Sequence, residues 1–86
     1  MARILVIDDE REVRIATRRI LERAGHEMVE AVTGEEGIEV LESTAVDLVI
    51  TDIMMPGQGG VESLAQMREL YSGLRVIAMS AHALDE

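Results

Sequence analysis

Three aspartates follow short apolar runs of the sequence, and their side chains could bind a cation together. Asp8 and Asp9 come directly after residues 4–7, and Asp52 comes directly after residues 48–51. Both runs are rich in branched residues, which is typical of buried strands. If the two strands are adjacent and parallel, the carboxylates meet at one edge of one sheet, where burial and like charges raise their pKa values. A divalent cation would relieve this repulsion, so the sequence predicts a Mg²⁺ site.

The three carboxylates suggest a division of roles. Mg²⁺ usually accepts only one or two carboxylates from the protein, together with water and phosphate oxygens. The additional carboxylate can act as a nucleophile, because aspartyl phosphates are established covalent intermediates. Asp52 stands alone between a strand and a loop and is the better candidate acceptor, while Asp9, and less directly Asp8, would hold the metal. The hydroxyl of Ser80, which follows another apolar run, could bond a phosphoryl oxygen.

Strand and helix patterns alternate along the chain, which predicts an α/β fold with a parallel sheet and flanking helices. Thr33 and Glu36 form a capping box at the start of the second helix, and Gly25 is a natural stop for the first. The candidate site residues all follow strand ends, where such sheets bind their ligands. The expected strands are residues 3–7, a segment within 26–32, 48–51 and 74–79, and the expected helices end near residues 25, 43–44 and 72–73.

The composition limits the possible functions of the chain. Its 86 residues suffice for one small domain, and the net charge of -9 argues against direct nucleic-acid binding. The absence of cysteine excludes disulfides and thiolate metal sites. No stretch reaches the length of a membrane span or resembles a signal peptide, so we expect a cytoplasmic location without a membrane partner. All eight basic side chains are arginines, so a mechanism that needs an ammonium group must find it in another molecule.

Several motifs, in order along the chain, resemble the receiver domain of bacterial two-component response regulators. They are residues 5–10 (Leu-Val-Ile-Asp-Asp-Glu), residues 47–56 (ending in Met-Met-Pro), Gly60 and residues 79–81 (Met-Ser-Ala).

The resemblance implies a flavodoxin-like (CheY-like) fold and phosphorylation of Asp52 by a histidine kinase or a phosphotransfer protein. It also implies Mg²⁺ held by Asp9, Asp52 and the backbone carbonyl of Met54, with Asp8 acting indirectly through water. Ser80 would be the hydroxyl residue that moves on activation.

The chain differs from this family by stopping after its fourth expected strand. Receiver domains resemble a five-fold strand–helix repeat, so residues 1–86 are expected to form a truncated receiver domain with four strands and three helices. The missing part would include the lysine that pairs with the phosphoryl group, and we expect phosphoryl transfer to Asp52 to be compromised. The fourth strand, with Val76, Ile77 and Met79, would become an apolar edge that favours a homodimer.

Three functions follow from these observations. The leading hypothesis is a phosphoacceptor module that acts as a switch and not as a turnover enzyme. The second is an inactive structural or interaction fragment of a receiver domain that dimerises through its exposed edge. The third, a Mg²⁺-dependent phosphohydrolase, is disfavoured because its motif places a second aspartate two residues after the first, where this chain has Glu10.

Simpler interpretations exist for the singled-out residues, and Asp52 by itself could be a turn residue. Asp8 and Asp9 could cap the first helix, because aspartate after a strand often does so. Ser80 could be an ordinary turn hydroxyl, and His26 and His82 are expected to be solvated loop residues. The arginine-rich face of the first helix is either a solvated surface or a contact for a partner.

Overall fold

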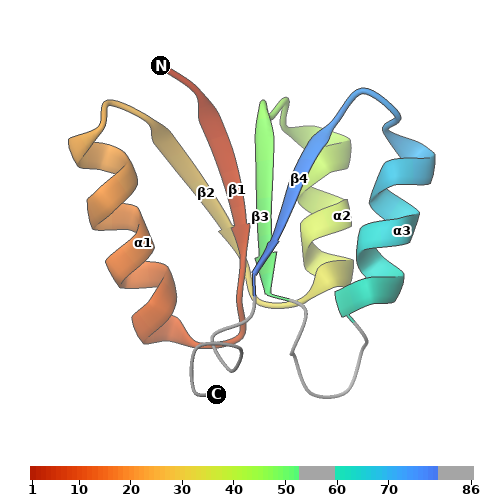
Figure 1. Cartoon of the computed structure of the whole chain (residues 1–86), viewed down its shortest axis with the longest axis horizontal. Helices are drawn as coiled ribbons and strands as arrows, with labels where there is room; N and C mark the ends of the chain where they lie inside the picture. The colour runs from red at the N-terminus through yellow and green to blue at the C-terminus, as the bar shows by residue number, and fades with distance from the viewer. Residues whose placement is uncertain (53–59, 80–86) are drawn as a thin grey trace.

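The computed structural model describes residues 1–52 and 60–79 of the chain. Strands and helices alternate throughout this part (Figure 1). The strand boundaries agree with the predicted ones to within one residue. In chain order the elements are β1 (Arg3–Ile7), α1 (Arg11–Arg23), β2 (Glu27–Ala31), α2 (Gly34–Ser43), β3 (Leu48–Asp52), α3 (Gly60–Leu70) and β4 (Arg75–Met79).

The strands form one sheet in the order β2-β1-β3-β4, and all neighbouring pairs are parallel. β1 therefore has β2 on one side and β3 on the other, and the strand order changes direction between β1 and β3. In sheets of this kind ligands bind beyond the carboxyl ends of the strands at this switch point. The predicted α/β fold with a parallel sheet is confirmed.

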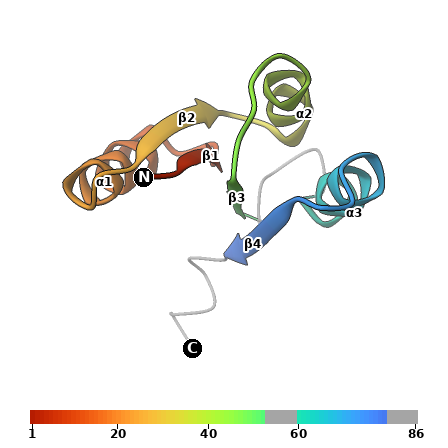
Figure 2. The same cartoon turned by 90° about the horizontal axis from the view of Figure 1, so that it is seen from above.

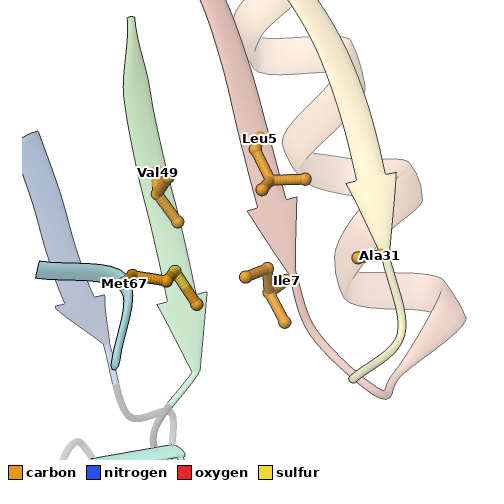
Figure 3. Packing of buried hydrophobic residues seen from close by; sticks show 5 residues of the cluster. All are labelled: Leu5, Ile7, Ala31, Val49 and Met67. Carbon is orange, nitrogen blue, oxygen red and sulfur yellow. The ribbon is translucent and has the colours of Figure 1, made fainter. Parts of the chain in front are cut away.

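The helices cover the sheet from both faces, with α1 on one side and α2 and α3 on the other (Figure 2). Successive residues of a strand point to opposite faces, and the buried residues of β1 accordingly divide between two clusters. Leu5 and Ile7 face α2 and α3, where they pack with Ala31, Val49 and Met67 (Figure 3). The opposite face carries a smaller cluster formed by Ile4, Val6 and Met28, with the α1 residue Leu21 packed against it.

The sequence places a largely apolar stripe on one face of α1, and this stripe is less buried than its helical spacing suggests. Its residues are Val13, Ala16, Thr17, Ile20, Leu21 and Ala24. In this helix no residue is fully buried, and Ile20 is 67% exposed. The helix packs mainly beside the edge strand β2, and Leu21 contacts the cluster on that face. Ala16 and Ala24 are exposed as well, whereas Val13 is half-buried.

The predicted capping box of α2 is present with one difference in its bonding. The Thr33 hydroxyl accepts a hydrogen bond from the Glu36 N–H at 3.1 Å, as predicted. The Glu36 carboxylate reaches back to the N–H of Val32 at 3.2 Å, one residue before the cap. Gly25, which follows α1, has a φ of 85°, a conformation that favours glycine.

The last described strand, β4, lies at the edge of the sheet. Its residue Val76 packs against the core beneath α2 and α3, whereas Ile77 and Met79 are exposed. The prediction of an apolar edge is thus confirmed for Ile77 and Met79. Within residues 1–52 and 60–79, no helix has the length and apolar character needed to cross a membrane.

Candidate metal centre

The pairing of β1 with β3 brings the predicted aspartates together. Ile7 is in register with Thr51, so Asp8, the first residue after β1, lies beside Asp52, the last residue of β3. Because the strands are parallel, both carboxylates lie at the same edge. One carboxylate oxygen from each of Asp8, Asp9 and Asp52 lies within 4.8 Å of the others.

The three aspartates differ in their exposure to solvent. Asp8 and Asp52 are buried, with 5% and 7% of their surface exposed, while Asp9 is open to solvent. A cation bound here would thus have two enclosed carboxylates and one carboxylate on the solvent side around it. Three hard oxygen donors with an open side fit Mg²⁺, which keeps some of its water ligands when it binds to proteins.

The electrostatics of Asp8 reflect this crowding. Burial raises the pKa of Asp8 above its ordinary value, and the negative charges of Asp52, Asp9 and Glu10 raise it further. The hydrogen bond from the Glu10 N–H opposes this increase without cancelling it. The metal-free site therefore holds its negative charge at an energetic cost, which a bound divalent cation would offset.

Three hydrogen bonds fix the position of Asp8 after β1. Its N–H donates to the carbonyl of Ala31 on β2 at 3.1 Å. Its carboxylate Oδ1 accepts from the Glu10 N–H at 2.8 Å, and its carbonyl accepts from Nη1 of Arg14 at 2.7 Å. The backbone and the side chain of Asp8 are thus both held before any ligand binds.

Neither Asp8 nor Asp9 caps the first helix. The N-cap of α1 is Glu10, whose side chain makes no capping hydrogen bond. Asp8 instead bonds the N–H of the capping residue itself, two positions further along the chain. The simpler interpretation of these aspartates as helix caps is therefore wrong.

A family model for the response regulator receiver domain matches residues 4–86. The chain belongs to this family. Its receiver fold is shared with solved structures of the family, so the flavodoxin-like (CheY-like) prediction is confirmed.

Three comparisons show how the receiver relates to known proteins. It is 35% identical over 85 residues to the transcriptional regulatory protein YvrH of Bacillus subtilis, covering 98% of this chain and 35% of YvrH. It superimposes with a TM-score of 0.88 and 38% identity on a chain from the crystal structure of histidine kinase ThkA in complex with response regulator TrrA, covering 94% of this chain and 70% of that one. Against TrrA from Thermotoga maritima in complex with Mg²⁺-BeF, the TM-score is 0.87 and the identity 35%, with coverage of 100% and 76%. The chain thus spans about a third of the length of YvrH.

The other residues singled out in the sequence lie either outside the described part of the chain or away from the cluster. Met54 and Ser80 lie outside the described residues, as does His82. His26 lies away from the cluster, but it is not simply solvated, because its Nδ1 accepts a hydrogen bond from the Ala2 N–H at 3.0 Å.

Arg14 contacts the acidic cluster, although it belongs to the arginine-rich face of the first helix, which was expected to be either a solvated surface or a contact for a partner. Its side chain is only 12% exposed. Besides the Asp8 carbonyl, it bonds the carboxylate of Glu30 on β2. The spacing of six residues from Asp8 was the available signal, since it places Arg14 in the first turns of the helix that follows the site.

Proposed function

We propose that this chain is a phosphoacceptor module of two-component signalling, in which Asp52 accepts a phosphoryl group with the help of Mg²⁺. The observation that carries the proposal is the convergence of three carboxylates within 4.8 Å at the ends of β1 and β3. The proposed metal ligands are Asp9, Asp52 and the backbone carbonyl of Met54, with Asp8 acting through water. Mg²⁺ would neutralise charge on the transferred phosphoryl group.

Asp52 is the proposed acceptor because Asp8 has another role. One oxygen of Asp8 already accepts a hydrogen bond from the Glu10 N–H, which ties this carboxylate to the turn after β1. An oxygen of Asp52 would form a bond to phosphorus while the bond from phosphorus to the donor's leaving atom breaks and the leaving group takes the electron pair. The carboxylate attacks as an anion, so no general base is required.

The phosphoryl donor is proposed to be a histidine kinase or a phosphotransfer protein. Support comes from the similar TrrA, which has been crystallised in complex with the histidine kinase ThkA. Residues 1–86 contain no lysine, so no lysine side chain among them assists the transfer. We therefore expect phosphorylation of residues 1–86 alone to be slow. The proposed module accepts one phosphoryl group per cycle and acts as a switch.

The phosphoacceptor proposal is tested by intact mass spectrometry after incubation with Mg²⁺ and acetyl phosphate. We expect a partial adduct of one phosphoryl group, which disappears in Asp52→Asn and on removal of Mg²⁺ by a chelator. Asp47→Asn removes an exposed carboxylate outside the cluster and is expected to keep the adduct.

Other outcomes of this experiment would identify the competing functions. An unmodified protein that still binds Mg²⁺ would contradict the phosphoacceptor and favour an inactive interaction fragment. Steady release of phosphate from an added phosphate ester would instead favour a phosphohydrolase. An adduct that persists in Asp52→Asn would place the acceptor at a different residue.

We further propose that two copies of the chain pair through β4. Within the described residues, β4 pairs with β3 alone, and its central residue Ile77 is 48% exposed. Such an edge presents unpaired backbone groups that another strand can satisfy. In a two-fold antiparallel pairing centred on Ile77, the two isoleucines would meet and no acidic residue of β4 would face its copy.

Sedimentation velocity over a range of concentrations tests this homodimer. We expect the average mass to rise toward that of a dimer, and Ile77→Lys to return it to that of a monomer. Ile15→Lys on α1, a similarly exposed isoleucine away from β4, is the control and should not change the association. A wild-type protein that stays monomeric at every concentration would refute the pairing.

A further inference from the structure

Arg14 links the acidic cluster to the edge strand β2. Its Nη1 donates to the Asp8 carbonyl at 2.7 Å, and its Nε donates to a carboxylate oxygen of Glu30 at 2.7 Å. Both distances are short, as expected for charge-assisted hydrogen bonds. The planar guanidinium thus connects α1, the turn after β1 and β2 at one point.

The Asp8 carbonyl belongs to the peptide group that joins Asp8 to Asp9. Because a peptide group is planar, a hydrogen bond to its oxygen also fixes the direction in which the chain enters Asp9. The Ala31 carbonyl fixes the preceding peptide group by accepting from the Asp8 N–H. Arg14 therefore completes the restraint on the segment that carries two of the three carboxylates.

Glu30 anchors Arg14 in this position. Hydrogen bonds from Arg14, and then from Arg18, lower the pKa of Glu30, so its carboxylate stays ionised at neutral pH. The side chain of Glu30 is partly exposed, whereas that of Arg14 is largely enclosed. Glu30 thus lies on the solvent side of Arg14, and the guanidinium of Arg14 extends from Glu30 to the Asp8 carbonyl.

Arg18 provides an internal comparison for Arg14. It lies one turn later on α1, donates to the other oxygen of Glu30 at 2.9 Å and donates to the carbonyl of Met28 at 3.2 Å. Both arginines therefore attach α1 to β2 through the same glutamate, and each also bonds one backbone carbonyl. They differ in that only the carbonyl bonded by Arg14 belongs to the acidic cluster.

We propose that Arg14, anchored by Glu30, is a positioning residue that holds the Asp8–Asp9 peptide group so that the carboxylates of Asp8 and Asp9 converge on Asp52. Mg²⁺ affinity then depends on a contact made by β2, a strand that supplies no carboxylate to the cluster. This inference rests on the proposed Mg²⁺ site.

The direction in which Mg²⁺ affinity changes when Arg14 is replaced separates a positioning role from a purely electrostatic one. Removing a positive charge beside an acidic cluster makes the site more negative, which by itself would strengthen Mg²⁺ binding. Loss of a positioning contact would weaken binding instead. Removal of groups that orient metal ligands typically lowers metal affinity about 10- to 100-fold.

The test compares Arg14→Met with Arg18→Met in metal-free and Mg²⁺-titrated protein by NMR. In Arg14→Met we expect shifted backbone amide resonances at Asp9 and Glu10 without metal, and Mg²⁺ affinity reduced about tenfold. Arg18→Met also loses one bond to Glu30 and one to a backbone carbonyl, but here the Asp9 and Glu10 resonances and the Mg²⁺ affinity should stay close to wild type. Arg14→Lys should not rescue affinity, because one ammonium lacks the fork that bonds both partners.

Unchanged Asp9 and Glu10 resonances in Arg14→Met, or Mg²⁺ binding as tight as in wild type, would overturn the inference. Equal effects in the two methionine variants would also overturn it, because they would show that the arginines only attach the helix. If wild-type protein binds no Mg²⁺, the metal site fails, and the metal-free resonances still decide the positioning role. Should Arg14→Met not fold, Glu30→Gln provides the same readouts, with smaller changes in the same direction.

Discussion

Asp8→Asn is expected to raise the free energy of unfolding of the metal-free protein by about 1–3 kcal/mol, the scale of repulsion between partly screened charges at such separations. The change removes one of three charges that lie within 4.8 Å of one another. The asparagine oxygen can still accept the hydrogen bond from the Glu10 N–H, so the turn after β1 is retained. Urea denaturation in the presence of a chelator measures the effect.

Asp47→Asn is the matched control for this gain in stability. It changes the net charge of -9 by the same amount, and the Asp47 carboxylate also accepts a backbone N–H, that of Arg3, at 2.8 Å. Because Asp47 is exposed and outside the cluster, we expect a change within about 0.5 kcal/mol. An Asp8→Asn protein that is no more stable than wild type, or an equal gain in Asp47→Asn, would contradict the electrostatic account.

Mg²⁺ should reverse the order of stability between wild type and Asp8→Asn. Saturating Mg²⁺ stabilises a folded protein that binds it, by about 2.7 kcal/mol at a concentration 100 times the dissociation constant. Wild type should gain this stabilisation, whereas Asp8→Asn should gain much less. The same denaturation measured with and without Mg²⁺ gives both values.

The gain from Asp8→Asn should depend on pH with a defined sign. The pKa of Asp8 is raised in the folded protein, chiefly by burial and then by the charges of Asp52 and Asp9. A raised pKa means that the folded state binds the proton more tightly, so wild type loses stability as the pH rises through this pKa. The difference in the free energy of unfolding between Asp8→Asn and wild type should be small below the ordinary aspartate pKa of about 3.9. It should reach its full size well above the raised pKa of Asp8. A difference that does not vary with pH would contradict this account.

Gly37→Ala is expected to lower the free energy of unfolding by about 1–3 kcal/mol, because it overfills a close-packed core. A Cβ at Gly37 on α2 would overlap Cδ1 of Ile7 and lie 3.0 Å from its Cγ1. Ile7 is fully buried, so it has little space to move away. The overlap is expected to outweigh the preference of helices for alanine over glycine, which is about 1 kcal/mol.

Two further variants test whether this overlap is the cause. Gly73→Ala is the control, because a Cβ there would meet nothing within 4 Å, and we expect a change within about 0.5 kcal/mol. Ile7→Val removes the overlapping Cδ1, so the double variant with Gly37→Ala should be more stable than the sum of the single effects predicts, by at least about 0.5 kcal/mol. Additive effects, measured by the same denaturation, would show that the contact is not responsible.

Local patterns were sufficient for most of the secondary structure. The apolar run at 48–51 predicted β3, and the spacing of Thr33 and Glu36 predicted the start of α2, because a strand or a capping box is encoded within a few neighbouring residues. The burial of α1 was less predictable. Its apolar spacing shows which residues share a face but not how much of that face another element covers, and Ile20 remained exposed.

The acidic cluster was predictable for a different reason. Asp8 and Asp52 follow strands that had to be neighbours for the cluster to form, and the parallel pairing of β1 with β3 met this condition. The role of Arg14 was not predictable in the same way. Five arginines lie on α1, and the sequence does not indicate which of them bonds the carbonyl of Asp8.

By itself, the sequence determined the chemistry available to this protein: carboxylates at the ends of apolar runs, eight arginines and no lysine. These properties belong to residue types and short spacings and do not depend on the packing. The tertiary structure alone decided that Asp8 and Asp52 are enclosed while Asp9 is open, and that Arg14, itself bonded to Glu30, donates to the Asp8 carbonyl. Burial and long-range hydrogen bonds depend on which strands pair and where the helices pack, and residues distant in the chain determine both.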